Sequence, residues 1–187
     1  MRIEEEIKLD YSDVLFRPKR STLKSRKDVD LNRKYSFKYS GSSWKGIPII
    51  ASNMDGVGEI DVAKELSSHK LMTALTKQHD INQIGTIYKR NIFFDSIALS
   101  CGTSKDSYNR LNAILKKYPK FKFICIDVAN GYSENFSNFV SEVRKKYPKK
   151  TIIAGNVVTA DMTQELVLSG ADIVKVGIGP GLSLIHI

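Results

Sequence analysis

Short apolar runs alternate with amphipathic segments along most of this chain. Six runs of four to six residues recur, and most of them are nearly continuous in apolar residues, which is typical of parallel strands that are covered on both faces. Successive runs begin roughly 20–30 residues apart, enough for one helix and two short loops in each interval. The predicted strands are residues 47–51, 71–75, 96–100, 121–126, 151–154 and 172–176.

The segments between the later runs have helical periodicity. One apolar stripe with helical spacing predicts a helix before the fifth strand: Phe136, Phe139, Val140, Val143 and Tyr147. Ser133 and Thr159 are placed to act as N-caps, and Gly170 is placed as the residue that follows a helix end. Six strand–helix units without a break in composition indicate one α/β domain.

Every predicted strand ends in small or polar residues, which suits a barrel whose loops build one site at the carboxyl ends of the strands. A doubly wound sheet would instead place a Gly-x-Gly-x-x-Gly turn after its first strand. Residues 53–58 read Asn-Met-Asp-Gly-Val-Gly, which does not match. We therefore predict a (β/α)8 TIM barrel, truncated after about six βα units. Its N-terminal extension carries irregular strands such as residues 35–38.

Composition and charge narrow the class of protein. Of 187 residues, 42% are hydrophobic and 26% are charged, which is ordinary for a globular domain. No stretch suits a membrane span or a secretion signal, so we expect a cytoplasmic protein. Cys101 and Cys125 stand alone in apolar runs, and we expect buried, reduced thiols. The net charge of +9 favours anionic partners. We expect no nucleic acid among them, because the aromatic residues lie on core stripes.

Three segments together resemble GMP reductases, in the wider IMP dehydrogenase/GMP reductase family. They are residues 13–26 (Asp-Val-Leu-Phe-Arg-Pro-Lys-Arg-Ser-Thr-Leu-Lys-Ser-Arg), residues 127–133 (Asp-Val-Ala-Asn-Gly-Tyr-Ser), and residues 154–181, which end in Gly-Ile-Gly-Pro-Gly. The Arg-Pro-Lys-Arg-Ser-Thr and Asp-Val-Ala-Asn-Gly-Tyr runs resemble the reductase rather than the dehydrogenase. Residues 77–96 also leave no room for the regulatory insertion that is usual in the dehydrogenase.

The resemblance implies reductive deamination of GMP to IMP and ammonia with NADPH, in purine nucleotide interconversion. In the family a cysteine attacks C2 of the purine, ammonia leaves, and the thioimidate accepts hydride. Such covalent catalysis divides one difficult substitution into two easier steps. The resemblance also implies a bound monovalent cation, normally K+, and a homotetramer as the full-length assembly.

The same resemblance suggests site residues by their matched positions. Lys77 and Asp127 match catalytic positions. Positions that contact the cofactor are matched by Ser25, Arg26, Lys77, Asp127, Val128, Ala129, Ile178 and Gly179. Gly179 and Gly181 match glycines whose carbonyl groups hold the cation. Beside Lys77 the family commonly has a histidine on each side, whereas this chain has Thr76 and Gln78, with His79 one place later.

The last six residues depart from the family. The expected continuation after Gly181 is Ser-Val-Cys, but this chain reads Leu-Ser-Leu-Ile-His-Ile, with Leu184 in the place of the nucleophilic cysteine. We expect an incomplete reductase domain over residues 1–181 and a non-family tail over residues 182–187 that arises from a sequence artefact. Because the nucleophilic cysteine is missing and two strand edges would stay unpaired, we predict that the chain as written is inactive and poorly soluble.

Two other functions fit the same residues. One is IMP dehydrogenase, which runs related chemistry with NAD. The other is a purine-nucleotide binder that has lost its catalytic cysteine. The sequence that follows Gly181 in the gene would separate all three.

Overall fold

The structure is a computed structural model that describes residues 7, 9, 11–89 and 94–177. Contacts divide the chain into two units, residues 1–30 and residues 31–187. The described part of the first unit holds two 3-10 turns, η1 (Tyr11–Asp13) and η2 (Arg26–Asp28). Ser25 caps the second turn: its Oγ accepts from the Lys27 amide, and its own amide donates to Asp28.

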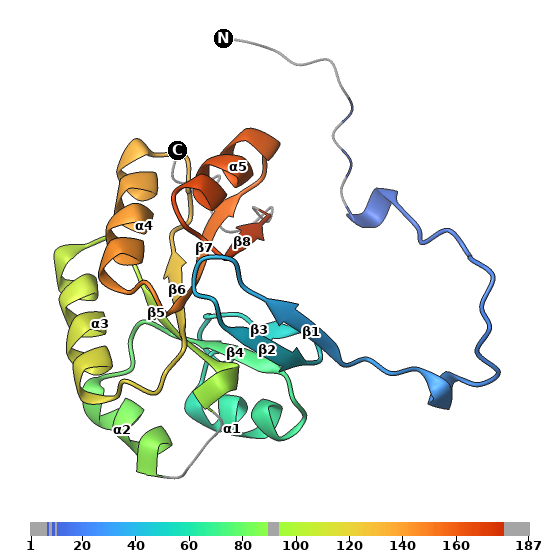
Figure 1. Cartoon of the computed structure of the whole chain (residues 1–187), viewed down its shortest axis with the longest axis horizontal. Coiled ribbons are helices and arrows are strands. Elements are labelled where there is room, and N and C mark those ends of the chain that lie inside the picture. Colours follow the sequence, from blue (N-terminus) through green and yellow to red (C-terminus); the bar gives the residue numbers. More distant parts are fainter. Residues whose placement is uncertain (1–6, 8, 10, 90–93, 178–187) are drawn as a thin grey trace. The chain divides into compact units, whose positions relative to one another are not determined.

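The second unit is an α/β structure built on a six-stranded parallel sheet (Figure 1). A hairpin of β1 (Arg33–Ser36) and β2 (Ser43–Gly46) precedes the sheet. The sheet strands are β3 (Ile50–Ala51), β4 (Met72–Leu75), β5 (Ile97–Cys101), β6 (Phe123–Asp127), β7 (Thr151–Val157) and β8 (Ile173–Val176). The connecting helices are α1 (Ile60–Ser68), α2 (Ile81–Lys89), α3 (Lys105–Lys117), α4 (Glu134–Lys146) and α5 (Ala160–Leu168), and the turn η3 (Phe94–Ser96) leads into β5.

The strand order follows the chain from β3 to β8 without reversal. A doubly wound sheet reverses its order at a switch point, so this topology excludes that alternative and confirms the barrel type. The sheet also curls, because Lys175 on β8 reaches Asn53, which follows β3 at the opposite end of the strand order. The result is an open half-barrel. Among the described residues, β3 and β8 each pair on one side only, and Ile50 and Val176 on these edges are exposed.

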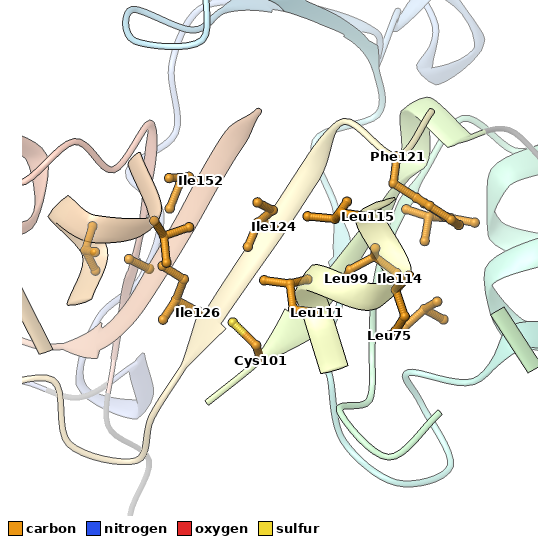
Figure 2. Packing of buried hydrophobic residues seen from close by; sticks show 14 of the residues in the cluster. Leu75, Leu99, Cys101, Leu111, Ile114, Leu115, Phe121, Ile124, Ile126 and Ile152 are labelled. Carbon is orange, nitrogen blue, oxygen red and sulfur yellow. The ribbon is translucent and has the colours of Figure 1, made fainter. Parts of the chain in front are cut away.

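One apolar core lies between the strands and the helices. Figure 2 shows Leu99, Ile124 and Ile126 from the strands facing Leu111 and Ile114 of α3. The helical stripe predicted before the fifth strand forms part of this core, with Phe136, Val140 and Val143 buried on α4. Burying side chains of this size removes about 1.5–3 kcal/mol of unfavourable hydration each, which holds the helices on the sheet.

A second core lies on the other face of the sheet, inside the half-barrel. It joins strand residues to the hairpin: Phe37, Trp44, Met72, Ala74, Ala98, Phe123, Cys125 and Ile153. Phe37 packs edge-on against Phe123, with ring centroids 5.7 Å apart. The hairpin therefore covers the end of the half-barrel at which the strands begin.

Most local predictions are confirmed. Ser133 caps α4, with its Oγ accepting from the Phe136 amide. Gly170 follows α5 with a φ of +105°, a conformation that favours glycine. The first sheet strand is shorter than residues 47–51, because Pro48 has no amide hydrogen to donate and the Ile49 amide donates to the carbonyl oxygen of Ile47 in the same segment. Within the described ranges, no helix has the length and apolar character needed to cross a bilayer.

Candidate functional site

Charged and polar side chains meet where the sheet strands end. Asp127 is the last residue of β6, and Lys175 is the third of the four residues of β8. The Lys175 ammonium donates to Asp127 Oδ1 and, at 3.2 Å, to Asn53 Oδ1. The side chains of Lys175 and Asp127 are 27% and 25% exposed, so both are partly screened from water but can still contact a ligand. We call this edge of the half-barrel the rim.

Lys175 is a site residue that the sequence alone did not reveal. Lys175 comes two residues after Ile173, so the two side chains lie on the same face of the strand. Ile173 packs into the interior core, and both side chains therefore point into the half-barrel. Gly155 on the neighbouring strand makes room, because a Cβ there would lie 2.6 Å from the Lys175 Cβ. The available signal was a single lysine in an otherwise apolar strand. Such a charge needs a partner.

Lys77 lies at the same rim, two residues after the end of β4, and it is exposed. Its chain neighbour Thr76 is buried and donates its amide hydrogen to the carbonyl oxygen of Gly58 at 2.9 Å. Lys77 and Asp127 thus share one edge of the sheet, as their positions after parallel strands require. The ammonium that pairs with Asp127 is that of Lys175.

The loop after β6 carries the predicted cofactor residues Val128 and Ala129. Val128 extends the pairing with β7, since its amide donates to Gly155 and its carbonyl accepts from Asn156. Ala129 is exposed. Tyr132 fastens the far end of the loop, because its hydroxyl oxygen accepts from the amides of residues 158 and 159, both at 3.0 Å. The loop is therefore held at both ends, with Ala129 open to solvent between them.

Asn156 connects this loop to the turn after β8. Its Nδ2 donates to the carbonyl oxygen of Gly177 at 3.0 Å. Its Oδ1 is buried and has no hydrogen-bond partner among the described residues. A buried acceptor without a donor is costly. The predicted residues Ile178, Gly179 and Gly181 follow Gly177 directly, and they fall outside the described residues, as does Leu184.

The two cysteines are unsuited to nucleophilic chemistry, as expected. Cys101 and Cys125 are both buried and both free. Burial raises the pKa of the Cys101 thiol to about 12 and that of the Cys125 thiol to about 11. The Lys175 ammonium acts in the opposite direction on Cys125. Since the thiolate is the reactive form, neither side chain is activated.

The remaining predicted residues, Ser25 and Arg26, belong to the N-terminal unit, which is described by itself. Ser25 is the cap of η2, and Arg26 is an exposed residue of the same turn. In the described part of the chain, no group of three or more His, Cys, Asp or Glu side chains could hold a metal ion. A cation site built from glycine carbonyl groups would not need such a group.

Comparisons with known proteins identify the family of this chain. The family model of the IMP dehydrogenase / GMP reductase domain matches residues 8–185. GMP reductase of Yersinia enterocolitica is 53% identical over 183 residues, which are 97% of this chain and 53% of the relative. GMP reductase of Escherichia coli is 52% identical over the same length.

A solved structure has the same fold. The inosine 5′-monophosphate dehydrogenase of Legionella pneumophila superposes with a TM-score of 0.74 at 28% identity, over 90% of this chain and 50% of its own. The chain spans about half the length of the curated relatives it matches. The matched segments and the half-barrel carry one conclusion: the chain belongs to the IMP dehydrogenase/GMP reductase family, as a homologue of GMP reductases.

Proposed function

We propose that this chain is part of a GMP reductase, which converts GMP to IMP and ammonia with NADPH in cytoplasmic purine nucleotide interconversion. The main support is the 53% identity to GMP reductase over 97% of the chain. The Legionella pneumophila IMP dehydrogenase, whose structure is solved, is more distant from this chain, at 28% identity. Dehydrogenase activity is therefore the alternative to be tested, not the proposal.

The rim fits a nicotinamide cofactor in one specific respect. Asn156 Oδ1 is a buried acceptor without a donor in the described part of the chain, and it lies beside the loop that holds Val128 and Ala129. The hydroxyl groups of a ribose or the amide of a nicotinamide would supply such a donor. When bound, NADPH supplies the hydride that replaces the amino group on C2 of the purine.

Asp127 and Lys77 are the residues to which we assign the chemistry. The Lys175 ammonium donates to Oδ1 of Asp127 and so fixes one of its carboxylate oxygens. The second oxygen can accept a hydrogen bond from the amino group, and the carboxyl group can relay the proton that this group must gain to leave as ammonia. Lys77 is exposed at the same rim, and its flexible ammonium can reach the substrate or the cofactor.

The other ligands follow from the matched positions. Ser25 and Arg26 would bind the adenosine end of NADPH, where the fork of a guanidinium suits a phosphate group. Ile178 and Gly179 would complete the cofactor site. The carbonyl groups of Gly179 and Gly181 would hold K+, since oxygen ligands suit a hard cation. We propose a homotetramer as the assembly of the intact enzyme.

A chimera tests the proposal. Residues 1–181 of this chain, joined to the part of the Yersinia enterocolitica reductase that follows its matched half, would supply the strands and the cysteine loop that this chain does not provide. We expect this chimera to oxidise NADPH only when GMP is present and to release IMP and ammonia. A soluble, folded chimera that is inactive with GMP and NADPH, or that instead reduces NAD with IMP, would overturn the proposal.

A further inference from the structure

A buried histidine lies directly behind the rim. His79 is 7% exposed, in the turn between β4 and α2. Its Nε2 lies 3.3 Å from Glu59 Oε2 and 3.3 Å from the carbonyl oxygen of Gly58. Both neighbours are acceptors, so Nε2 must carry the hydrogen and donate it. This requirement fixes the orientation of the ring.

Arg110 holds the backbone of the same residue. It is half-buried on α3, and its guanidinium donates to the carbonyl oxygen of His79 and, at 2.7 Å, to that of Ser100 at the end of β5. The two bonds use different nitrogens of one rigid fork. Arg110 therefore ties the turn after β4 to the end of the next strand.

These contacts bracket Lys77. On one side, the Thr76 amide donates to Gly58. On the other side, His79 donates to the same carbonyl through its ring and accepts from Arg110 through its backbone. The backbone is thus fixed one residue before Lys77 and two residues after it, while the Lys77 side chain remains exposed.

We propose that His79 is a positioning residue for Lys77, and that its partners Glu59 and Arg110 hold it in place. This inference rests on the proposed function, in which Lys77 meets the substrate and the cofactor. The Nε2–H group of His79 acts by fixing the turn on the start of α1, so that the flexible lysine side chain begins from a defined point. Displacing a reacting group by about 1 Å can cost about a hundredfold in rate.

Two substitutions distinguish the effect of the His79 hydrogen-bond donor from the effect of its side-chain volume. His79→Leu keeps an apolar side chain of similar size but removes the hydrogen-bond donor. His79→Gln keeps an N–H group at about the position of Nε2. In the chimera we expect His79→Leu to lower kcat/KM for NADPH roughly 10- to 100-fold. We expect His79→Gln to recover activity to within about threefold of the unsubstituted chimera.

The chain offers a matched control at His69. Its Nε2 also lies 3.3 Å from a glutamate, Glu65, but these side chains are 64% and 75% exposed at the C-terminal end of α1. His69→Leu should leave kcat/KM unchanged. A double-mutant cycle adds a test that a purely structural role would not pass. In a Lys77→Ala background, His79→Leu should cost little more, because the side chain that it positions is gone.

Hydrogen exchange gives a readout that does not need activity. In the chimera, the Thr76 amide should exchange faster in His79→Leu than in the unsubstituted protein or in the His69→Leu and His79→Gln variants. Wild-type kcat/KM in His79→Leu, additive effects with Lys77→Ala, or no rescue by His79→Gln would each overturn the positioning role. The two failures are distinct: an inactive unsubstituted chimera overturns the proposed function, whereas an active one that is indifferent to His79→Leu overturns this inference.

Discussion

The two ends of the parallel sheet are held together by different kinds of contact. Where the strands begin, the carboxylate of Asp172 is fully buried and accepts from Arg144 and from the amides of Tyr39, Ser40 and Ile152. Where they end, the Lys175–Asp127 pair is about a quarter exposed, Lys77 is exposed, and the buried Oδ1 of Asn156 has no partner among the described residues. In barrels the first end serves stability and the second serves function.

The two ends therefore differ in how their polar groups are bonded. Where the strands begin, the polar groups are satisfied within the protein and serve stability. At the rim, polar groups are left open and serve function. Substitutions where the strands begin should change the free energy of unfolding and leave chemistry intact. Substitutions at the rim should do the reverse. Each of the following experiments can break this division.

The largest effect is expected at the rim, from Asp127→Asn in the chimera. The substitution keeps the shape of the side chain but removes the charge and the proton acceptor, so kcat should fall by about 10²–10⁴. The free energy of unfolding should change by less than about 1 kcal/mol, because the pair with Lys175 is partly exposed. Steady-state kinetics and urea unfolding measure the two quantities. A loss of stability without a loss of kcat would reverse the roles assigned to the two ends.

The second effect is expected where the strands begin, from Asp172→Ala. The substitution leaves Arg144, which is 13% exposed, without its carboxylate partner and three amides without an acceptor. Breaking a buried pair of this kind costs about 3–5 kcal/mol in the free energy of unfolding.

Asp95→Ala is the matched control for this experiment, because Asp95 pairs with Lys122 at 2.8 Å on the surface. It should cost less than about 1 kcal/mol. Urea unfolding compares the two variants. Below its unfolding transition, the Asp172→Ala chimera should keep its kcat. Equal losses of stability in both variants would contradict the assigned role of Asp172.

The sequence predicts the elements of this fold better than it predicts their contacts. The stripe on α4 and its cap at Ser133 depend on residues within a few positions of each other, so local periodicity is sufficient. The parallel sheet follows from the repeated units. The hairpin is different: residues 35–38 suggested an irregular strand, but the pairing of Tyr35 with Trp44 depends on a partner strand that the sequence pattern did not reveal.

The site residues divide in the same way into those that the sequence predicts and those whose role depends on contacts between distant segments. Lys77 and Asp127 could be named because they match functional positions of the family. Lys175 lies within a matched segment, but its contacts depend on curling the sheet until β8 reaches the loop after β3. Glu59, His79 and Arg110 also come from three separate segments. Contacts of this kind are properties of the curled arrangement of strands, and single-residue propensities do not contain them.

A smaller effect is expected from Tyr132→Phe, which tests the loop of Val128 and Ala129. The substitution removes the oxygen that accepts from the amides of residues 158 and 159. We expect a loss of about 1 kcal/mol, seen as a rise of up to about fivefold in the KM for NADPH. Tyr35→Phe, on the hairpin, should leave this KM unchanged. An equal rise in both variants would mean that the loop is not held by Tyr132.

The smallest effect is expected from the two thiols. They test whether water reaches the cores on the two faces of the sheet. Cys101 lies in the helix-side core, and Cys125 lies in the interior core below Lys175. Burial raises the pKa of both thiols in the folded state, to about 12 and about 11, above the ordinary value of 9.0. Below the ordinary value both states keep the proton, and the stability from these groups is fully present. As the pH rises, the unfolded chain loses its protons first, so this stability declines and is lost as the pH passes through the folded-state values.

Between about pH 8 and about pH 9, we expect a decline of a few tenths of a kcal/mol for each thiol. Urea unfolding at a series of pH values measures it, and Cys101→Ala and Cys125→Ala should each flatten the slope. The thiols should also resist alkylation until the protein unfolds, because the thiolate is the reactive species. Rapid labelling of Cys125 alone in the folded protein would show that water reaches the interior through the rim. The Lys175–Asp127 pair would then line an open channel instead of shielding the interior core from water.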